Sequence, residues 1–283
     1  MSKKTRELEK HKSQISDEAM SLYKERVLAI MRDFHLFLVD HGIKYSLAFG
    51  TLIGALRHDG FIPWDDDIDI ILTNEEFHKL LKVVDEFNDD RYMVVKPLDD
   101  TPLAVPGMLK IYDKTACIQE FGVSAYSGPF IDVFSLISIK SEKKHKAAAL
   151  RFKINAVLLM FKNKRFNAHD ALIDHAKALS FLSHFVSANH LKHNLKKYYD
   201  RDFESDLYID SFGCMRVVYR SEMFSSYDLH KFGDYEFYIA NGSDSFLKRT
   251  FGDYMTLPPV EKRNPHHLKY LSFEESFVDK NKF

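Results

Sequence analysis

Cysteine is nearly absent from this chain, which argues against two classes of protein. Only Cys117 and Cys214 occur among the 283 residues, and they stand far apart with no CxxC pair. A disulfide framework needs several paired cysteines, and a structural zinc site needs clustered cysteine or histidine ligands. The chain fits neither class, and we predict a reducing, cytoplasmic compartment.

Long apolar runs are also missing. The most apolar stretch, INAVLLMF at 154–161, is bounded on both sides by lysine and arginine. It is far shorter than the ~20 apolar residues that a membrane-spanning helix requires. The N-terminal stretch MSKKTRELEKHKSQ is polar, and no apolar segment of signal-peptide length follows it. We expect a protein that carries no export signal and does not cross a membrane by itself.

A net charge is the third absence, because 40 Lys and Arg nearly balance 41 Asp and Glu, for a formal charge of -1. This balance gives no overall attraction to nucleic acid, so we predict no nucleic-acid partner. Hydrophobic residues make up 45% and charged residues 29%, which is typical of an ordinary soluble globular protein. The length allows one large domain or a core with an appended lobe.

One segment departs from the balance of charge. Between Lys140 and Arg165 the chain has nine Lys or Arg residues against one acid, Glu142. Two interpretations stay open. One is a solvated helix face, and the other is a surface that docks on an anionic membrane, where each cation contributes on the order of 1 kcal/mol. In the second case the protein is peripheral at the inner face of the membrane.

The order of apolar patterns predicts a mixed α/β core. Helical spacing covers 27–38, and IKYSLAF at 43–49 is typical of a strand. GTLIGALRHDG at 50–60 predicts a tight turn and a short helix, and Thr73 with Glu76 forms a capping box for the next helix. Further strands are predicted at 92–96, 107–113 and 130–137, with a hairpin arm at TACIQE (115–120).

We divide the chain into three parts. Residues 1–140 form the core, and residues 141–200 form a helical lobe, because charges separate apolar positions there and Gly and Pro are absent. Residues 201–283 contribute short aromatic-rich strands, a helix at 243–251 and a tail. The predicted fold class is α/β in the broad sense and α+β in the narrow sense, with a mixed sheet.

The stretch FIPWDDDIDIIL at 61–72 crowds four carboxylates at the start of an apolar strand. A solvated turn explains one or two of them. Alternation along DIDII, however, places Asp67 and Asp69 on one strand face, with isoleucines on the other. Two carboxylates about 7 Å apart on one face need a cation to offset their repulsion.

A calcium loop of the EF-hand type is a second interpretation, because four acids fall at its positions one, three, five and twelve. These acids are Asp65, Asp67, Asp69 and Glu76. The sixth position is Ile70, however, where such a loop needs glycine for its sharp turn. The spacing alone therefore does not predict calcium.

A third interpretation is a two-metal site for phosphoryl or nucleotidyl transfer. Oxygen ligands at the edge of a strand suit Mg²⁺, or Mn²⁺ in its place, which completes its shell with substrate phosphate oxygens. Such a site also requires a carboxylate from a neighbouring strand. FIDVF supplies one, since Asp132 stands alone in an apolar strand where an unpaired charge would be costly.

Three stretches together resemble the LicD family, which includes bacterial phosphocholine transferases and the fukutin-related proteins. They are YSLAFGTLIGALRHDGFIPWDDDIDI (45–70), FIDVF (130–134) and FGDYMTLPPVEKRNPHH (251–267). The resemblance implies the polymerase-β-like fold of the nucleotidyltransferase superfamily. The pattern of that superfamily is a Gly-Ser or Gly-Thr turn, an acid-hydrophobic-acid strand and a third acid between hydrophobic residues. It maps onto Gly50 with Thr51, Asp67 with Asp69, and Asp132.

The resemblance also implies the reaction. A phosphorylated alcohol, either phosphocholine or a polyol phosphate, would pass from a CDP-activated donor to a hydroxyl of a cell-surface glycan or teichoic acid, with release of CMP. The implied metal ligands are Asp67 and Asp69, with Asp65 as a further ligand and Asp132 as ligand or base. Asp66 is left as a turn residue. Two alternatives are kept: a nucleotidyltransferase that releases pyrophosphate, and a non-catalytic module that binds metal or glycan.

Four residues are candidates to bind the donor phosphates. A glycine turn at a helix start lets backbone N–H groups approach a phosphate, which suits Gly50 and Thr51. Arg57 and Lys110 are candidates to neutralise the phosphoryl charge, with a surface cation as the alternative for each.

The remaining candidates would contact the rest of the donor. Trp64, the sole tryptophan, would pack against a nucleobase or a choline-like group, or else in the core. Arg263, His266 and His267 match the basic tail motif of the family. They would close over the donor, or else form a surface tail.

Overall fold

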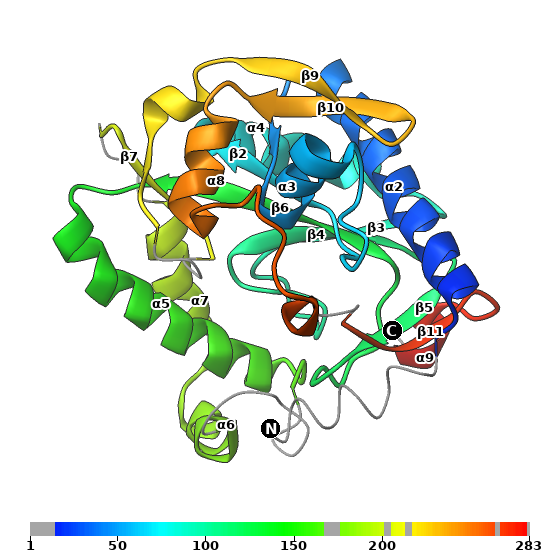
Figure 1. Ribbon diagram of the computed structural model, residues 1–283. Coiled ribbons are helices and arrows are strands. Elements are labelled where there is room, and N and C mark those ends of the chain that lie inside the picture. Colours follow the sequence, from blue (N-terminus) through cyan, green and yellow to red (C-terminus); the bar gives the residue numbers. More distant parts are fainter. Residues whose placement is uncertain (1–14, 167–175, 201–204, 213–216, 264–266, 282–283) are drawn as a thin grey trace.

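The computed structural model describes residues 15–166, 176–200, 205–212, 217–263 and 267–281. Within these ranges a mixed sheet forms the centre of the molecule and helices lie around it (Figure 1). The predicted mixed α/β fold class is confirmed.

The sheet is built around β6 (Phe130–Ser138), in which every residue is buried. The strand order is β1-β2-β6-β4-β3, where β1 is Ser46–Leu47, β2 is Asp69–Thr73, β4 is Met108–Asp113 and β3 is Tyr92–Val95. β2 and β6 run parallel, and the other neighbours are antiparallel. The later part of β6 pairs with β7 (Leu207–Asp210), which pairs with β8 (Tyr219–Arg220). The strands predicted at 92–96, 107–113 and 130–137 are thus confirmed to within one residue.

Helix α2 (Asp17–Asp40) packs on the sheet and contacts β4 and β6. It starts earlier than the predicted 27–38 because Ser16 caps it, accepting a hydrogen bond from the Ala19 N–H at 3.1 Å. Its buried side chains follow helical spacing and include Val27, Ile30, Met31, Phe34 and Leu38.

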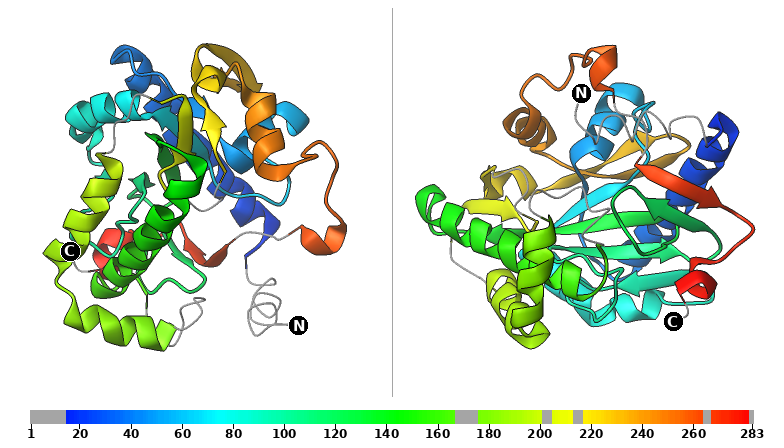
Figure 2. Two further views of the ribbon diagram at one scale, coloured as in Figure 1. Left: turned by 90° about the vertical axis from the view of Figure 1, so that its left-hand side faces the viewer. Right: turned by 90° about the horizontal axis from the view of Figure 1, so that it is seen from below.

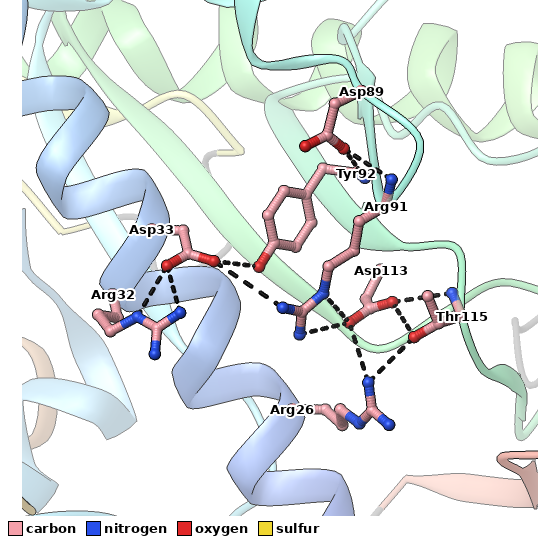
Figure 3. A network of polar contacts seen from close by, with 8 residues as sticks. All are labelled: Arg26, Arg32, Asp33, Asp89, Arg91, Tyr92, Asp113 and Thr115. Atoms are coloured by element: carbon pink, nitrogen blue, oxygen red, sulfur yellow. Dashed lines mark hydrogen bonds and ion pairs between the residues drawn. The ribbon is translucent and has the colours of Figure 1, made fainter.

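A polar network fixes α2 against β3 and β4 (Figure 3). The Asp113 carboxylate is fully buried and accepts hydrogen bonds from Arg91 at 3.0 Å and from the Thr115 hydroxyl at 2.5 Å. Tyr92 donates its hydroxyl to Asp33 of α2 at 2.5 Å. Because a buried carboxylate is costly without partners, these contacts favour one position of the helix on the sheet.

Two short helices connect the strands that carry the acidic residues. The predicted strand at 43–49 shortens to β1, because the chain turns directly into α3 (Phe49–His58). α4 (Asn74–Val83) begins after Thr73, whose hydroxyl accepts from the Glu76 N–H at 3.4 Å, as the predicted capping box requires. The Glu76 carboxylate accepts instead from a distant backbone N–H, so half of the box forms.

The described part of the segment predicted as a helical lobe is mainly helical, with non-helical residues at 163–166 and 186–187. Its helices are α5 (Glu142–Lys162), α6 (Ala176–Phe185) and α7 (Ala188–Tyr199). α5 packs against both of the others, and the three gather at the lower left of Figure 1 while α2 lies at the right. Among the described residues, no helix is long and apolar enough to span a bilayer.

The chain beyond residue 217 returns to the core at several points. β9 (Tyr227–Phe232) and β10 (Tyr235–Ala240) form a hairpin, and the Ala240 N–H donates to the Ser46 hydroxyl of β1 at 2.9 Å. α8 (Ser243–Phe251) ends at Gly252, as predicted.

The described residues also form short helices elsewhere, which are η1 (Val84–Phe87), η2 (Ser221–Phe224), η3 (Val260–Lys262) and α9 (Phe277–Asn281).

The predicted hairpin arm at 115–120 is largely replaced by a different pairing. β5 (Cys117–Glu120) pairs with β11 (Leu268–Ser272) from the tail, and only one bridge, between Ile118 and Ser127, joins it to the loop that follows. The tail strand covers the buried Cys117 and Ile118, which the following loop does not pair along their length. The C-terminal tail therefore lies in contact with the N-terminal half.

Candidate active site

Three neighbouring strands bring three predicted residues into one row. The register pairs Asp69 of β2 with Asp132 of β6, and Asp132 with Lys110 of β4. Residues paired across adjacent strands point to the same face of a sheet. The two carboxylates and the ammonium therefore share one face of the central sheet.

Lys110 and Asp132 form a buried ion pair. Lys110 Nζ lies 2.6 Å from Asp132 Oδ1, and the two side chains are 4% and 12% exposed. The ammonium also lies 3.4 Å from the centre of the Phe130 ring. Burial raises the pKa of Asp132, although the charge of Lys110 opposes that rise. In this structure Lys110 contacts a carboxylate of the site, whereas its predicted partner is a donor phosphate.

Three carboxylates beside this pair have no cation within 4 Å in the part of the chain that the structure describes. They are Asp65, Asp67 and Asp69. Burial, and after it the charge of neighbouring carboxylates, raises the pKa of Asp67 and Asp69 well above the usual range. The pKa of Asp65 is raised for the same reasons. A bound cation would relieve this repulsion.

The alternation predicted for DIDII is present. Ile68 and Ile70 are fully buried, while Asp67 and Asp69 keep partial exposure. The carboxylates therefore occupy the open face, as the period of a strand requires.

The turn into α3 positions two of the carboxylates. A Cβ at Gly50 would lie 2.5 Å from Asp65 Oδ2, so the carboxylate has room only beside a glycine. The Thr51 hydroxyl, which is buried, accepts a hydrogen bond from the Asp69 N–H at 2.8 Å. Phe49 has a φ of 46°, a strained value for a residue with a side chain, and aromatic packing holds it there. The predicted contact of Gly50 and Thr51 with a phosphate stays a prediction.

Asp66, which the sequence leaves as a turn residue, is buried and paired with the tail. It is 4% exposed and accepts a hydrogen bond from the His267 N–H at 3.1 Å, while His267 Nδ1 lies 3.5 Å from its other oxygen. The hydrogen bond with Asp66 raises the pKa of His267 to about 9. One residue of the tail motif thus contacts the acidic stretch, and His266 lies outside the described residues.

A second cluster joins Trp64, Arg57 and Arg263. The Arg263 guanidinium lies 4.8 Å from the centre of the Trp64 ring. Arg57 donates to the Tyr254 carbonyl at 2.5 Å, and burial, followed by the charge of Arg263, lowers the pKa of Arg57. Within the described ranges neither arginine forms an ion pair. A guanidinium over an indole ring, with a second guanidinium close enough to affect its charge, forms a suitable site for an anion that carries an aromatic or cationic group.

The oxygen ligands suit a hard divalent cation, but they do not form a complete cage. In the described part of the chain, no group of three or more His, Cys, Asp or Glu side chains is arranged to hold a metal ion. Mg²⁺ usually takes one or two protein carboxylates and completes its shell with water and substrate phosphate oxygens. Asp67 and Asp69, with Asp65 beside them, fit this pattern, whereas Asp132 is engaged by Lys110. The residues therefore fit a metal ion that binds together with a phosphorylated substrate.

Sequence reasoning missed a second ion pair, which lies near Asp132. The Arg165 guanidinium lies 3.2 Å from the Glu120 carboxylate and donates to the carbonyls of Pro102 and Leu103 at 3.3 Å. Glu120 and Arg165 both act on the pKa of Asp132, in opposite directions. No local signal marks this pair, because it forms where β5 meets the end of α5.

Two cavities lie away from these residues. One of about 620 Å³ lies at the far ends of β2 and β6, beside Thr73 and Ser138. Another of about 340 Å³ lies between α5 and α8, beside His145 and Arg249. Neither is lined by a predicted site residue, so we locate the candidate site from the charged groups and not from the size of a cavity.

Comparison with known proteins agrees with the resemblance carried by these residues. A family model described as LicD/FKTN/FKRP, nucleotidyltransferase domain, matches residues 42–189. The lipopolysaccharide cholinephosphotransferase LicD of Haemophilus influenzae is 30% identical over 256 residues, which cover 86% of this chain and 93% of that protein. An uncharacterized protein of Rickettsia prowazekii is 40% identical over 77 residues, or 27% of each chain. The family match includes the acidic stretch, Lys110 and Asp132.

Proposed function

This chain belongs to the LicD family, and from that premise we propose that it transfers a phosphorylated alcohol from a CDP-activated donor to a glycan hydroxyl, releasing CMP. The enzyme class is that of the LicD-type transferases. The name of the Haemophilus relative favours phosphocholine as the transferred group, and a polyol phosphate is the alternative. The observation that carries the proposal is the row of Asp69, Asp132 and Lys110 with Asp67 beside it.

In this proposal Asp67 and Asp69 hold Mg²⁺, or Mn²⁺, with Asp65 as a further ligand. When bound, the cation would polarise the phosphoryl group and offset its negative charge. The raised pKa of the carboxylates, which burial and mutual repulsion cause, supports this assignment.

Asp132 would take the proton of the attacking hydroxyl. A general base works best when its pKa lies near the operating pH, and burial moves the pKa of Asp132 upward. The ion pair with Lys110 would keep its carboxylate in one orientation. The acceptor oxygen bonds to the phosphorus of the transferred group, the bond from that phosphorus to the bridging oxygen breaks, and CMP leaves with the electron pair.

The donor would lie between the α3 turn and the arginine cluster. Arg57 and Arg263 would contact diphosphate oxygens, because one guanidinium group can donate two parallel hydrogen bonds to two phosphate oxygens. The Trp64 ring would contact the nucleobase or the choline group. Backbone N–H groups at Gly50 would approach a phosphate at the start of α3.

We further propose that the acceptor is a glycan carried on a lipid, and that transfer takes place in the cytoplasm at the inner face of the membrane. The relative is named for lipopolysaccharide, which is such an acceptor. The scarcity of cysteine and the basic segment at 140–165 agree with this location.

The decisive experiment is product analysis with a panel of CDP-alcohols and CTP, with Mg²⁺ present or chelated. We expect CMP from one CDP-alcohol, no turnover in chelator, and no turnover in Asp67→Asn or Asp69→Asn. Asp228→Asn, at an exposed position on β9, is the control and should keep full activity. Pyrophosphate release from CTP would replace the proposal with a nucleotidyltransferase. Metal binding without any release from the whole panel would replace it with a non-catalytic module.

A further inference from the structure

Helix α6 exposes three of its four large apolar side chains, and the fourth, Leu179, is partly buried against the core. Phe181, Leu182 and Phe185 are 65%, 51% and 73% exposed. The buried face carries Ala176 and Ser183. An amphipathic helix of a globular protein normally has the opposite arrangement, with its large apolar residues against the core. The exposed face of α6 therefore calls for a partner that covers it.

This apolar face is held on a fixed support. The rings of Phe181 and Phe185 are 5.0 Å apart in an edge-to-face contact on successive turns of the helix. Lys162 at the end of α5 donates to the Ser183 carbonyl at 3.1 Å, which ties α6 to its neighbour. Figures 1 and 2 show α6 at the outer end of the lobe, away from the central sheet. The two rings thus form one projecting patch at the edge of the molecule.

The lobe that carries the patch is positive. Residues 141–200 contain twelve Lys or Arg and four acids, Glu142, Asp170, Asp174 and Asp200, whereas the whole chain has a formal charge of -1. The exposed cations include Lys143, Lys146, Arg151, Lys164 and Lys177. A second copy of this chain would bring the same positive charge against it, so self-association through this face is disfavoured.

We propose that the α6 face, which comprises Phe181, Leu182 and Phe185, docks on an anionic lipid surface. Aromatic and leucine side chains enter the boundary between headgroups and acyl chains, and lysines and arginines of the same lobe contact anionic headgroups. The lobe combines exposed apolar side chains with positive charge. A helix face that only contacts solvent would not need the apolar side chains. The inference stands on exposure and charge and does not depend on the transfer reaction.

The test is cosedimentation of the full chain with vesicles, without any substrate. We expect binding to phosphatidylcholine vesicles that contain phosphatidylglycerol, weak binding to phosphatidylcholine alone, and a decrease with added salt. Phe181→Ser with Phe185→Ser should lower the partition coefficient roughly tenfold or more, with unchanged thermal unfolding because both positions are exposed. The matched control replaces exposed leucines elsewhere, Leu36→Ser with Leu229→Ser, at 55% and 50% exposure.

The control should bind as the wild type does. Equal binding by the phenylalanine variant, or equal loss in the control, would overturn the proposal. Equal binding to neutral vesicles would remove the role of charge and overturn it in this form. If light scattering finds a wild-type dimer that the phenylalanine variant breaks, the face belongs to a second copy. Because no substrate is present, none of these outcomes bears on the CMP-releasing reaction.

Discussion

Removing the charge of Lys110 should show how strongly the fold depends on the buried pair. Lys110→Met keeps an apolar side chain of similar length and leaves Asp132 without its partner. In the wild type the charged atoms are 2.6 Å apart and the side chains are 4% and 12% exposed. Breaking a buried pair by removing one partner typically costs about 3–5 kcal/mol, because the remaining charge is buried and uncompensated. We expect a loss of unfolding free energy in that range near neutral pH.

The loss should shrink as the pH falls. Burial raises the pKa of Asp132 and Lys110 restrains the rise, so the carboxyl of the variant should have a still higher pKa. Between the unfolded value of about 3.9 and the folded value, the folded state keeps a proton that the unfolded state has lost. Stability therefore falls as pH rises through that window, by at most about 1.4 kcal/mol per pH unit. The difference between variant and wild type should be smallest at its acid end.

Urea unfolding in EDTA, at about pH 5 and about pH 8, measures both effects without bound cations. The matched control is Lys96→Met. The Lys96 ammonium is also 2.6 Å from a carboxylate, that of Asp85, but these side chains are 31% and 70% exposed. Such exposed pairs contribute about 0–1 kcal/mol. The reasoning fails if Lys110→Met costs no more than Lys96→Met, or if its cost does not grow with pH.

Two further predictions concern residues that contact the acidic stretch, Gly50 and His267. Gly50→Ala should lower turnover with little change in unfolding, because the new methyl would lie 2.5 Å from Asp65 Oδ2 and the free end of that side chain can swing away. A full rate in this variant would remove Asp65 from the site. His267→Gln should remove a pH-dependent stabilisation, since the hydrogen bond with Asp66 raises the pKa of His267 to about 9. That stabilisation is complete below the unfolded value of about 6.5 and disappears as pH rises through the folded value, so melting temperatures should fall less for the variant across this window. Parallel melting curves would mean that the pair does not stabilise the fold.

The acidic residues of the site could be predicted because the patterns that mark them lie within single strands. Alternation along a strand is sufficient to place Asp67 and Asp69 on one face and the isoleucines on the other. A single carboxylate in an apolar strand, Asp132, is conspicuous because an unpaired charge there would be costly. Gly50 at the start of α3 is also visible in the sequence, although its closeness to Asp65 is not.

The missing parts depend on contacts between distant segments. The sequence predicts a donor phosphate as the partner of Lys110, whereas the structure pairs it with Asp132 on the adjacent strand. The sequence around Asp66 is typical of a turn, and nothing near it in the chain indicates its hydrogen bond with His267 of the tail. The contact of Glu120 with Arg165 requires the meeting of β5 and the end of α5. Periodicity assigns a face to a residue, but it does not say which strand or helix covers that face.

The site contains a cluster of carboxylates and a cluster of arginines, and each lacks a partner of opposite charge among the described residues. In the described part of the chain, Asp67 and Asp69 have no cation and Arg57 and Arg263 have no anion within ion-pair distance. The clusters adjoin, because Trp64, which carries the Arg263 guanidinium over its ring, directly precedes the acidic run. A divalent cation bound to a diphosphate would supply both missing charges together, so binding of either component would strengthen binding of the other by the same factor. Carboxylates that repel one another in the free protein then have a physical use, since the same repulsion becomes affinity for a metal that arrives with its phosphates.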